Sequence, residues 1–233
     1  MIISGLQPTS LSDYPRKVSA IIFTQGCNFK CPYCHNPQLI PSPISPKLSS
    51  QFVLDFLKKR ANLLQAVVIT GGEPTLQPNL IPFLEQVKAL GYKIKLDTNG
   101  SRPNVIEEIA KKKCLDYIAM DIKAPLEKYH LFSGCSVNKE ALIQSINLIR
   151  SFNSSYYIHY EFRTTVTRSL LNISDIIQCG KLLNGAAQYI LQDITPQGLG
   201  KNLYSKEEIY SNQEKKEILK LVSEYVNVYW RNY

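Results

Sequence analysis

The 233-residue sequence predicts an α/β fold in which a partial (β/α)6 barrel of parallel strands is surrounded by outer helices. Six short apolar runs, rich in β-branched and aromatic residues, each precede a stretch in which apolar residues recur at helical spacing. Repeated strand–helix units require parallel pairing with right-handed crossovers. A hydrophobic content of 44% is enough for one substantial core, so we expect a single domain over residues 1–233.

The first third of the chain sets up this alternation. Residues 1–16 show little periodicity and are expected to form an irregular lead-in. The first strand is expected at residues 18–23, because this run is short, apolar and β-branched, as in a strand covered on both faces. Four prolines stiffen residues 37–48, which we expect to be an ordered loop. Ser49 or Ser50 can then cap the first helix.

The later elements repeat the pattern. Gly91 is a typical stop for a helix over residues 80–90, and Pro103 a typical start for a helix over residues 105–112. The remaining strands are expected at residues 66–70, 92–96, 117–120, 156–162 and 189–191, and the remaining helices at 139–150, 173–183 and 213–225. Residues 202–233 are thus expected to hold a C-terminal helix and a short strand.

Composition limits the classes of function. No window reaches eighteen consecutive apolar residues, and the first residues lack the basic region and cleavage site of a signal peptide, so we expect a cytoplasmic protein with no membrane partner. The formal charge of +8 comes largely from lysines near expected helix ends, where the helix dipole favours them. No basic stripe interleaves with aromatic residues, which argues against a nucleic-acid partner.

Polar and glycine residues follow every expected strand. In barrels of parallel strands the carboxyl ends meet at one rim, and working groups stand there. The groups at this rim are Cys27, Cys31 and Cys34; Gly71, Gly72 and Glu73; Asp97, Thr98 and Asn99; Asp121 and Lys123; Arg163; and Gln192 with Gln197. Six loops with structural duties alone would not all be expected to place such groups together.

The loop after the first strand, residues 25–36, is called the cysteine loop below. Its three thiols have the spacing C-x3-C-x2-C, which brings soft ligands onto one loop. A [4Fe–4S] cluster can use three thiolates and leave one iron open, whereas a structural zinc would need His35 or a distant fourth ligand. Spacing alone also permits three ordinary cysteines. The other cysteines, Cys114, Cys135 and Cys179, occur singly and are expected to be small buried residues.

The other rim groups each have a functional and a structural interpretation. Gly71 and Gly72 would let a ligand approach the backbone, and Glu73 could accept from an ammonium group, but the same sequence can form a plain turn. Asp97 and Asp121 could share a cation or bind a sugar, or could cap helices. The further expectations are that Lys123 and Arg163 suit a carboxylate, and that Tyr33 and His35 could pack on a purine.

Together these motifs resemble the radical S-adenosylmethionine (SAM) superfamily, through the cysteine spacing followed by Gly71-Gly72-Glu73-Pro74 at the second strand end. Asp97-Thr98-Asn99-Gly100 and Asp121-Ile122-Lys123 are similar to sequences of the activating enzymes of glycyl radical enzymes. Gly5-Leu6-Gln7 and Asp13-Tyr14-Pro15 look most like the activating proteins of anaerobic ribonucleoside-triphosphate reductase. The resemblance covers about residues 1–200 and is weakest after 165; Arg16 departs from it, because the family tends to have glycine there.

The resemblance implies a radical SAM barrel with a [4Fe–4S] cluster on Cys27, Cys31 and Cys34, whose open iron binds SAM. It also implies that Glu73, with the Gly71-Gly72 backbone, receives the SAM amino group, and that adenine lies near Tyr33 and His35. The SAM carboxylate and a monovalent cation would lie near the positions of Asp97, Thr98, Asp121 and Lys123, with Arg163 a less certain contact. The implied partners are a glycyl radical enzyme as protein substrate and reduced flavodoxin or ferredoxin as electron donor.

Two other functions stay open at this stage. One is a radical SAM enzyme acting on a small molecule or nucleobase, such as a deazapurine synthase-like enzyme. The other is a non-enzymatic iron–sulfur or zinc protein. The single cysteines have no ligand-like spacing to one another, which argues against enzymes that carry auxiliary clusters.

Overall fold

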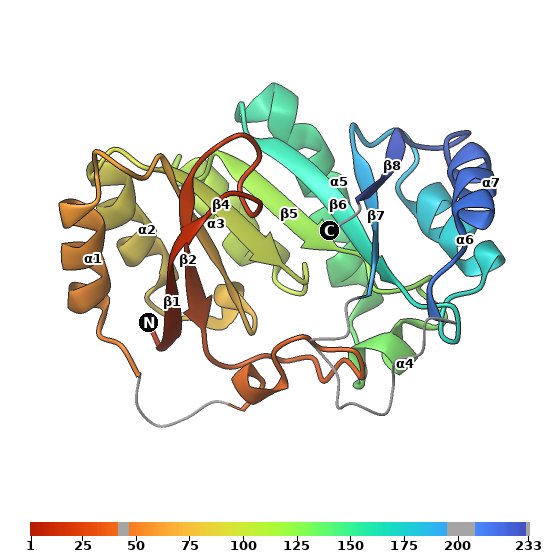
Figure 1. The fold of residues 1–233 in the computed structure, drawn as a ribbon, viewed down its shortest axis with the longest axis horizontal. Helices are drawn as coiled ribbons and strands as arrows, with labels where there is room; N and C mark the ends of the chain where they lie inside the picture. Colours follow the sequence, from red (N-terminus) through yellow and green to blue (C-terminus); the bar gives the residue numbers. More distant parts are fainter. Residues whose placement is uncertain (42–46, 195–207, 232–233) are drawn as a thin grey trace.

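The computed structural model describes residues 1–41, 47–194 and 208–231. Figure 1 shows a curved sheet with helices on its outer side. The strands are β1 (Ile3–Ser10), β2 (Ser19–Thr24), β3 (Ala66–Gly71), β4 (Lys93–Thr98), β5 (Tyr117–Asp121), β6 (His159–Val166), β7 (Tyr189–Asp193) and β8 (Val228–Arg231). The helices are α1 (Ser50–Lys59), α2 (Leu80–Ala89), α3 (Pro103–Lys111), α4 (Tyr129–Ser133), α5 (Lys139–Ser155), α6 (Ile173–Leu182) and α7 (Asn212–Val222), with short 3-10 turns η1 (Pro37–Leu39) and η2 (Pro74–Leu76).

The expected parallel barrel is confirmed. The strands follow one another across a single sheet in chain order, and β2 to β8 are all parallel. No pairing joins β1 to β8 within the described residues, so this sheet is an open, partial barrel. Because helices connect the parallel strands, the carboxyl ends of β2 to β7 lie along one rim.

One expectation about the first part of the chain was wrong. Residues 1–16 are not wholly irregular, because residues 3–10 form β1, which pairs antiparallel with β2. Only the two end residues of this edge strand are buried and its pairing has two register irregularities, so it lacks the alternation that marks a buried strand. The proline-rich loop contains the short turn η1, and residues 42–46 of that loop lie outside the described residues. Gln197 and residues 202–207, about which expectations were also stated, lie outside them too.

Local signals fix several elements as expected. The Ser49 side chain accepts from Phe52 N and caps α1. Pro103 lies in the first turn of α3. Arg16 has φ 60°, in the left-handed region that glycine adopts most easily. Arg16 therefore adopts a backbone conformation that suits glycine, the residue that the family tends to have at this position.

The two faces of the sheet differ in chemistry. Residues such as Ile94, Leu96 and Phe162 belong to the main apolar core, which includes buried side chains of the helices. Strand residues alternate between faces, so Lys95 and Asp97 lie on the opposite, inner face. The barrel interior therefore holds charged side chains that must be paired.

No helix of the described residues is long and apolar enough to cross a membrane.

Candidate active site

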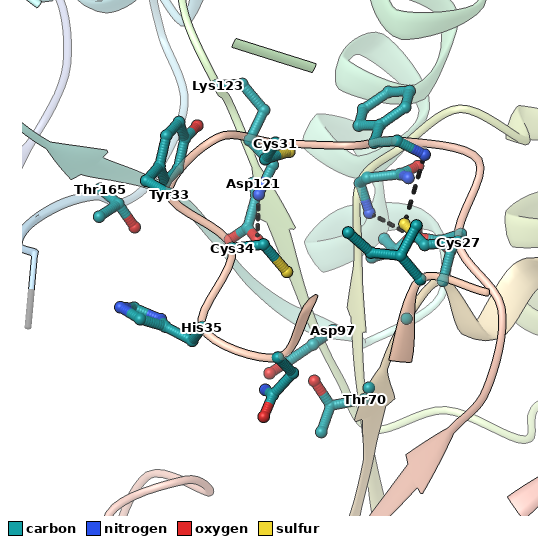
Figure 2. Close-up of a pocket in the computed structure, with 18 of the residues that line it drawn as sticks. Cys27, Cys31, Tyr33, Cys34, His35, Thr70, Asp97, Asp121, Lys123 and Thr165 are labelled. Carbon is teal, nitrogen blue, oxygen red and sulfur yellow. Dashed lines mark hydrogen bonds and ion pairs between the residues drawn. The ribbon is translucent and has the colours of Figure 1, made fainter. Parts of the chain in front are cut away.

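A pocket of about 240 Å³ opens at the carboxyl rim. Every site residue that the sequence predicted within the described ranges lines this pocket. These residues are Cys27, Cys31, Tyr33, Cys34, His35, Gly71, Gly72, Glu73, Asp97, Thr98, Asn99, Asp121, Lys123, Arg163 and Gln192. Figure 2 shows the cysteine loop curving around Asp97, Asp121 and Lys123. The structure thus brings together groups that are up to 165 positions apart in sequence.

The three thiols surround the pocket and do not converge on one point. Within the described ranges, no three His, Cys, Asp or Glu side chains lie close enough together to hold a single metal ion. Burial raises the pKa of the Cys27 thiol to about 12 and raises that of Cys31. Three thiols spread around one pocket suit a cluster, which has its own bridging sulfides and cationic irons, better than a single zinc ion.

Glu73 is a buried acceptor at the end of β3. Its Oε1 accepts from Thr75 N at 3.0 Å, from Thr98 Oγ1 at 2.7 Å and from Thr75 Oγ1, and its Oε2 accepts from Asn99 N at 2.7 Å. The residue is only 1% exposed, and burial raises its pKa in spite of these bonds. Oε1 thus accepts three of these bonds and Oε2 only one, so Oε2 retains room for one further donor.

Charged side chains form a chain beneath the cysteine loop. Arg163 Nε lies 3.0 Å from Asp121 Oδ1, and Arg163 Nη1 lies 3.3 Å from Asp97 Oδ2. Lys123 Nζ is 2.9 Å from the other Asp121 oxygen, and Lys95 Nζ is 2.8 Å from Asp97 Oδ1. Burial opposes ionisation of both acids, but the neighbouring cations, of which Arg163 has the largest effect, hold the pKa of each acid below its usual range.

The strand register explains these pairings and corrects one expectation. Asp121 and Arg163 are direct partners in the β5–β6 ladder. Arg163 was expected just after the strand, but β6 runs on through Val166, because Thr164, Thr165 and Val166 are β-branched. Lys95 was missed by sequence analysis, although its spacing of two from Asp97 in a strand could have signalled it.

Tyr33 and His35 flank Cys34 but differ in environment. The Tyr33 ring is buried and packs edge-on against Phe132, with ring centroids 6.2 Å apart. Its hydroxyl has no hydrogen-bond partner among the described residues. His35 is exposed at the mouth of the same pocket. Thr70 and Thr165, which sequence analysis did not select, also line this pocket.

Comparison with known proteins agrees with this geometry. Residues 21–162 match the profile of the radical SAM superfamily. A Methanocaldococcus jannaschii protein provisionally named a glycyl-radical enzyme activating enzyme is 33% identical over 229 residues, covering 97% of this chain and 93% of the relative. The pyruvate formate-lyase-activating enzyme of Clostridium pasteurianum is 27% identical, covering 88% of this chain and 85% of the relative.

A solved structure supports the fold. SuiB of Streptococcus suis bound to S-adenosylmethionine superposes on this chain with a TM-score of 0.65 at 17% sequence identity. The match covers 89% of this chain and 48% of SuiB, so this chain spans about half of SuiB's length. The family implies a [4Fe–4S] cluster and SAM binding, and the thiols and acceptors around the pocket fit both. The chain therefore belongs to the radical SAM superfamily of enzymes.

Proposed function

We propose that this chain is an activase that cleaves SAM reductively and generates a glycyl radical on a partner enzyme. The observation that supports this most is the match, along nearly the full length of both chains, to a relative named as an activating enzyme of this kind. The pocket adds the chemistry, because its three thiols and the buried Glu73 line the same space. We also propose that residues 1–233 act as one radical SAM domain.

In this proposal Cys27, Cys31 and Cys34 hold the cluster. When bound and reduced, the cluster would supply the electron that breaks the C5′–S bond of SAM, and the 5′-deoxyadenosyl radical released would take a hydrogen atom from a glycine. The thiols must be deprotonated to act as ligands, and their raised pKa values mean that binding the irons has to displace these protons. The protein's own task is to position the reactants and exclude water.

The remaining pocket residues orient SAM. Glu73 Oε2 receives the SAM ammonium at its free accepting position, while Thr98 and Asn99 hold the Glu73 carboxylate in place. The backbone of Gly71 and Gly72, which line the same pocket, receives the ammonium together with Glu73. Lys123 is proposed for the SAM carboxylate, and Tyr33 and His35 for the adenine, since all three line the pocket.

A monovalent cation near Asp97, Thr98 and Asp121 remains part of the proposal. Each acid already faces two cationic side chains, so a bound ion would compete with Arg163 for their oxygens. SAM cleavage measured in potassium and in tetramethylammonium buffers tests this. A several-fold loss without potassium supports the ion, and equal rates in the two buffers contradict it.

Anaerobic ribonucleoside-triphosphate reductase is the partner that we propose, with reduced flavodoxin or ferredoxin as donor and the cytoplasm as the location. Support comes from the similarity of Gly5-Leu6-Gln7 and Asp13-Tyr14-Pro15 to its activating proteins. The test is anaerobic incubation of the reconstituted chain with SAM, reductant and either this reductase or pyruvate formate-lyase, followed by electron paramagnetic resonance (EPR). A glycine-centred signal on the reductase alone is expected. A signal on pyruvate formate-lyase alone would overturn the choice of partner.

A further inference from the structure

Two glycines from different loops lie against the cysteine loop. The first is Gly72, after β3, where an added Cβ would stand 2.1 Å from Gly26 O. That oxygen belongs to the peptide group that joins Gly26 to Cys27. The same carbonyl accepts a hydrogen bond from Glu73 N at 2.8 Å. Gly72 thus allows the β3 loop to press directly on the peptide before the first thiol.

The second glycine is Gly134, which ends α4 in the left-handed region with φ 65°. A Cβ there would stand 2.3 Å from Lys30 O, the carbonyl of the peptide group that joins Lys30 to Cys31. Lys30 N donates to Ser133 O at 2.6 Å, so the backbone is held on both sides of Lys30. Gly134 therefore has the same relation to Cys31 that Gly72 has to Cys27.

Side chains extend this contact along residues 129–135, here called the α4 segment. The Tyr129 ring packs edge-on against Phe29 with centroids 6.3 Å apart, and Phe132 packs on Tyr33 as described above. Cys135 Sγ donates to Asn28 O at 3.3 Å. Figure 1 shows α4 lying beside the chain that follows β2.

The cysteine loop has little internal support of its own. Its described internal bonds are Cys34 N to Cys31 O at 3.1 Å and Phe29 N to Cys27 Sγ at 3.4 Å. Residues 27–36 contain no helix or strand. The position of Cys31 is consequently set by what packs against Lys30, and the closest described backbone is that of Ser133 and Gly134.

We infer that Gly134 is a positioning residue for Cys31, and that the α4 segment clamps the middle of the cysteine loop in the geometry that a cluster needs. This inference rests on the proposed role of the three cysteines as cluster ligands. Groups that orient metal ligands commonly change metal affinity about 10–100-fold when they are altered. Gly134 carries no ligand atom, so it acts only through the Lys30–Cys31 peptide.

The test is Gly134→Ala compared with Gly91→Ala. Gly91 is also left-handed, with φ 88°, but a Cβ there meets nothing within 4 Å. Both variants place alanine in a disfavoured conformation, whereas only Gly134→Ala must push the Lys30 carbonyl. The measurements are iron and sulfide per chain, the rate of cluster loss to a chelator, the EPR spectrum of the reduced cluster with and without SAM, and circular dichroism of the apoprotein.

Gly134→Ala is expected to lose its cluster at least about 10-fold faster than wild type and to shift the EPR spectrum, while Gly91→Ala stays within about 2-fold and keeps the wild-type spectrum. Equal cluster retention and equal spectra in the two variants would overturn the inference. If circular dichroism shows that Gly134→Ala does not fold, Phe132→Leu decides, with faster cluster loss supporting the clamp and wild-type behaviour refuting it. A wild-type chain that takes up no cluster would instead refute the proposed function.

Discussion

Arg163 connects the two acids beneath the cysteine loop, so its replacement by methionine should destabilise the fold measurably. The Arg163 side chain is 12% exposed, and its guanidinium bonds to both Asp97 and Asp121. Removing one partner of a buried ion pair costs about 3–5 kcal/mol, because a charge is left uncompensated. Here Lys95 and Lys123 remain as second partners of the two acids, so we expect a loss of about 2–3 kcal/mol in the free energy of unfolding.

The pH dependence of this loss identifies its cause. The folded-state pKa values of Asp97 and Asp121 lie below their usual range, so their ionisation contributes stability above the unfolded pKa of about 4, and that stability disappears as the pH falls through the folded values. The variant lacks part of this contribution. Because burial opposes ionisation of both acids, loss of Arg163 should raise their folded-state pKa values, and the difference between wild type and Arg163→Met should be largest near pH 7 and shrink as the pH falls through the variant's values toward those of the wild type.

Denaturant unfolding of the apoprotein from pH 7.5 down to about pH 3.5 measures both effects. Arg102→Met is a matched control, because Arg102 is exposed at the start of α3, and it should change stability by less than about 0.5 kcal/mol. A loss below about 0.5 kcal/mol for Arg163→Met, or a larger loss that is constant across this pH range, would show that Arg163 does not stabilise the fold by pairing with the ionised acids.

Three further predictions concern single contacts. Cys31→Ala should abolish cluster assembly, measured by iron content, together with SAM cleavage, measured by 5′-deoxyadenosine formation. Cys114→Ala, at a buried site away from the pocket, should retain both. SAM cleavage by Cys31→Ala would contradict the assignment of Cys31 as a ligand. Glu73→Gln should weaken SAM binding about 10-fold or more in calorimetry, since a charged hydrogen bond contributes about 1.5–3 kcal/mol. Because burial raises the pKa of Glu73, wild-type affinity should fall as the pH drops through that pKa and the variant should lack this fall; parallel profiles would contradict the role. Tyr117→Phe removes a 2.9 Å hydrogen bond to the buried Glu161 and should lower the free energy of unfolding by about 1–3 kcal/mol. An unchanged denaturant midpoint would contradict this prediction.

The sequence predicted the barrel and the rim residues well, and the reason is physical. Buried parallel strands are apolar runs that stand out in a sequence, and parallel order alone places their carboxyl ends together. Only this ordering was needed to predict that Cys27, Glu73 and Asp121 would meet in one pocket. The edge strand β1 escaped prediction because only Ile3 and Ser10 in it are buried.

The pairings within the site needed information that one sequence does not contain. Arg163 meets Asp121 because of the register between β5 and β6, which is set by packing. The buried Lys95 is explicable only once the inner face of the barrel is known to hold Asp97. The role inferred for Gly134 depends on a contact with Lys30, more than one hundred positions earlier in the chain.

The central claim is that this chain takes a hydrogen atom from a glycine of a protein partner. The most direct measurement uses a partner enzyme prepared with glycine deuterated at Cα, incubated with the reconstituted chain, reductant and SAM. We expect one deuterium in the 5′-deoxyadenosine and a glycine-centred EPR signal that lacks the doublet splitting seen with the unlabelled partner. Formation of 5′-deoxyadenosine that is independent of the partner, without deuterium transfer or a glycine-centred signal, would contradict this claim.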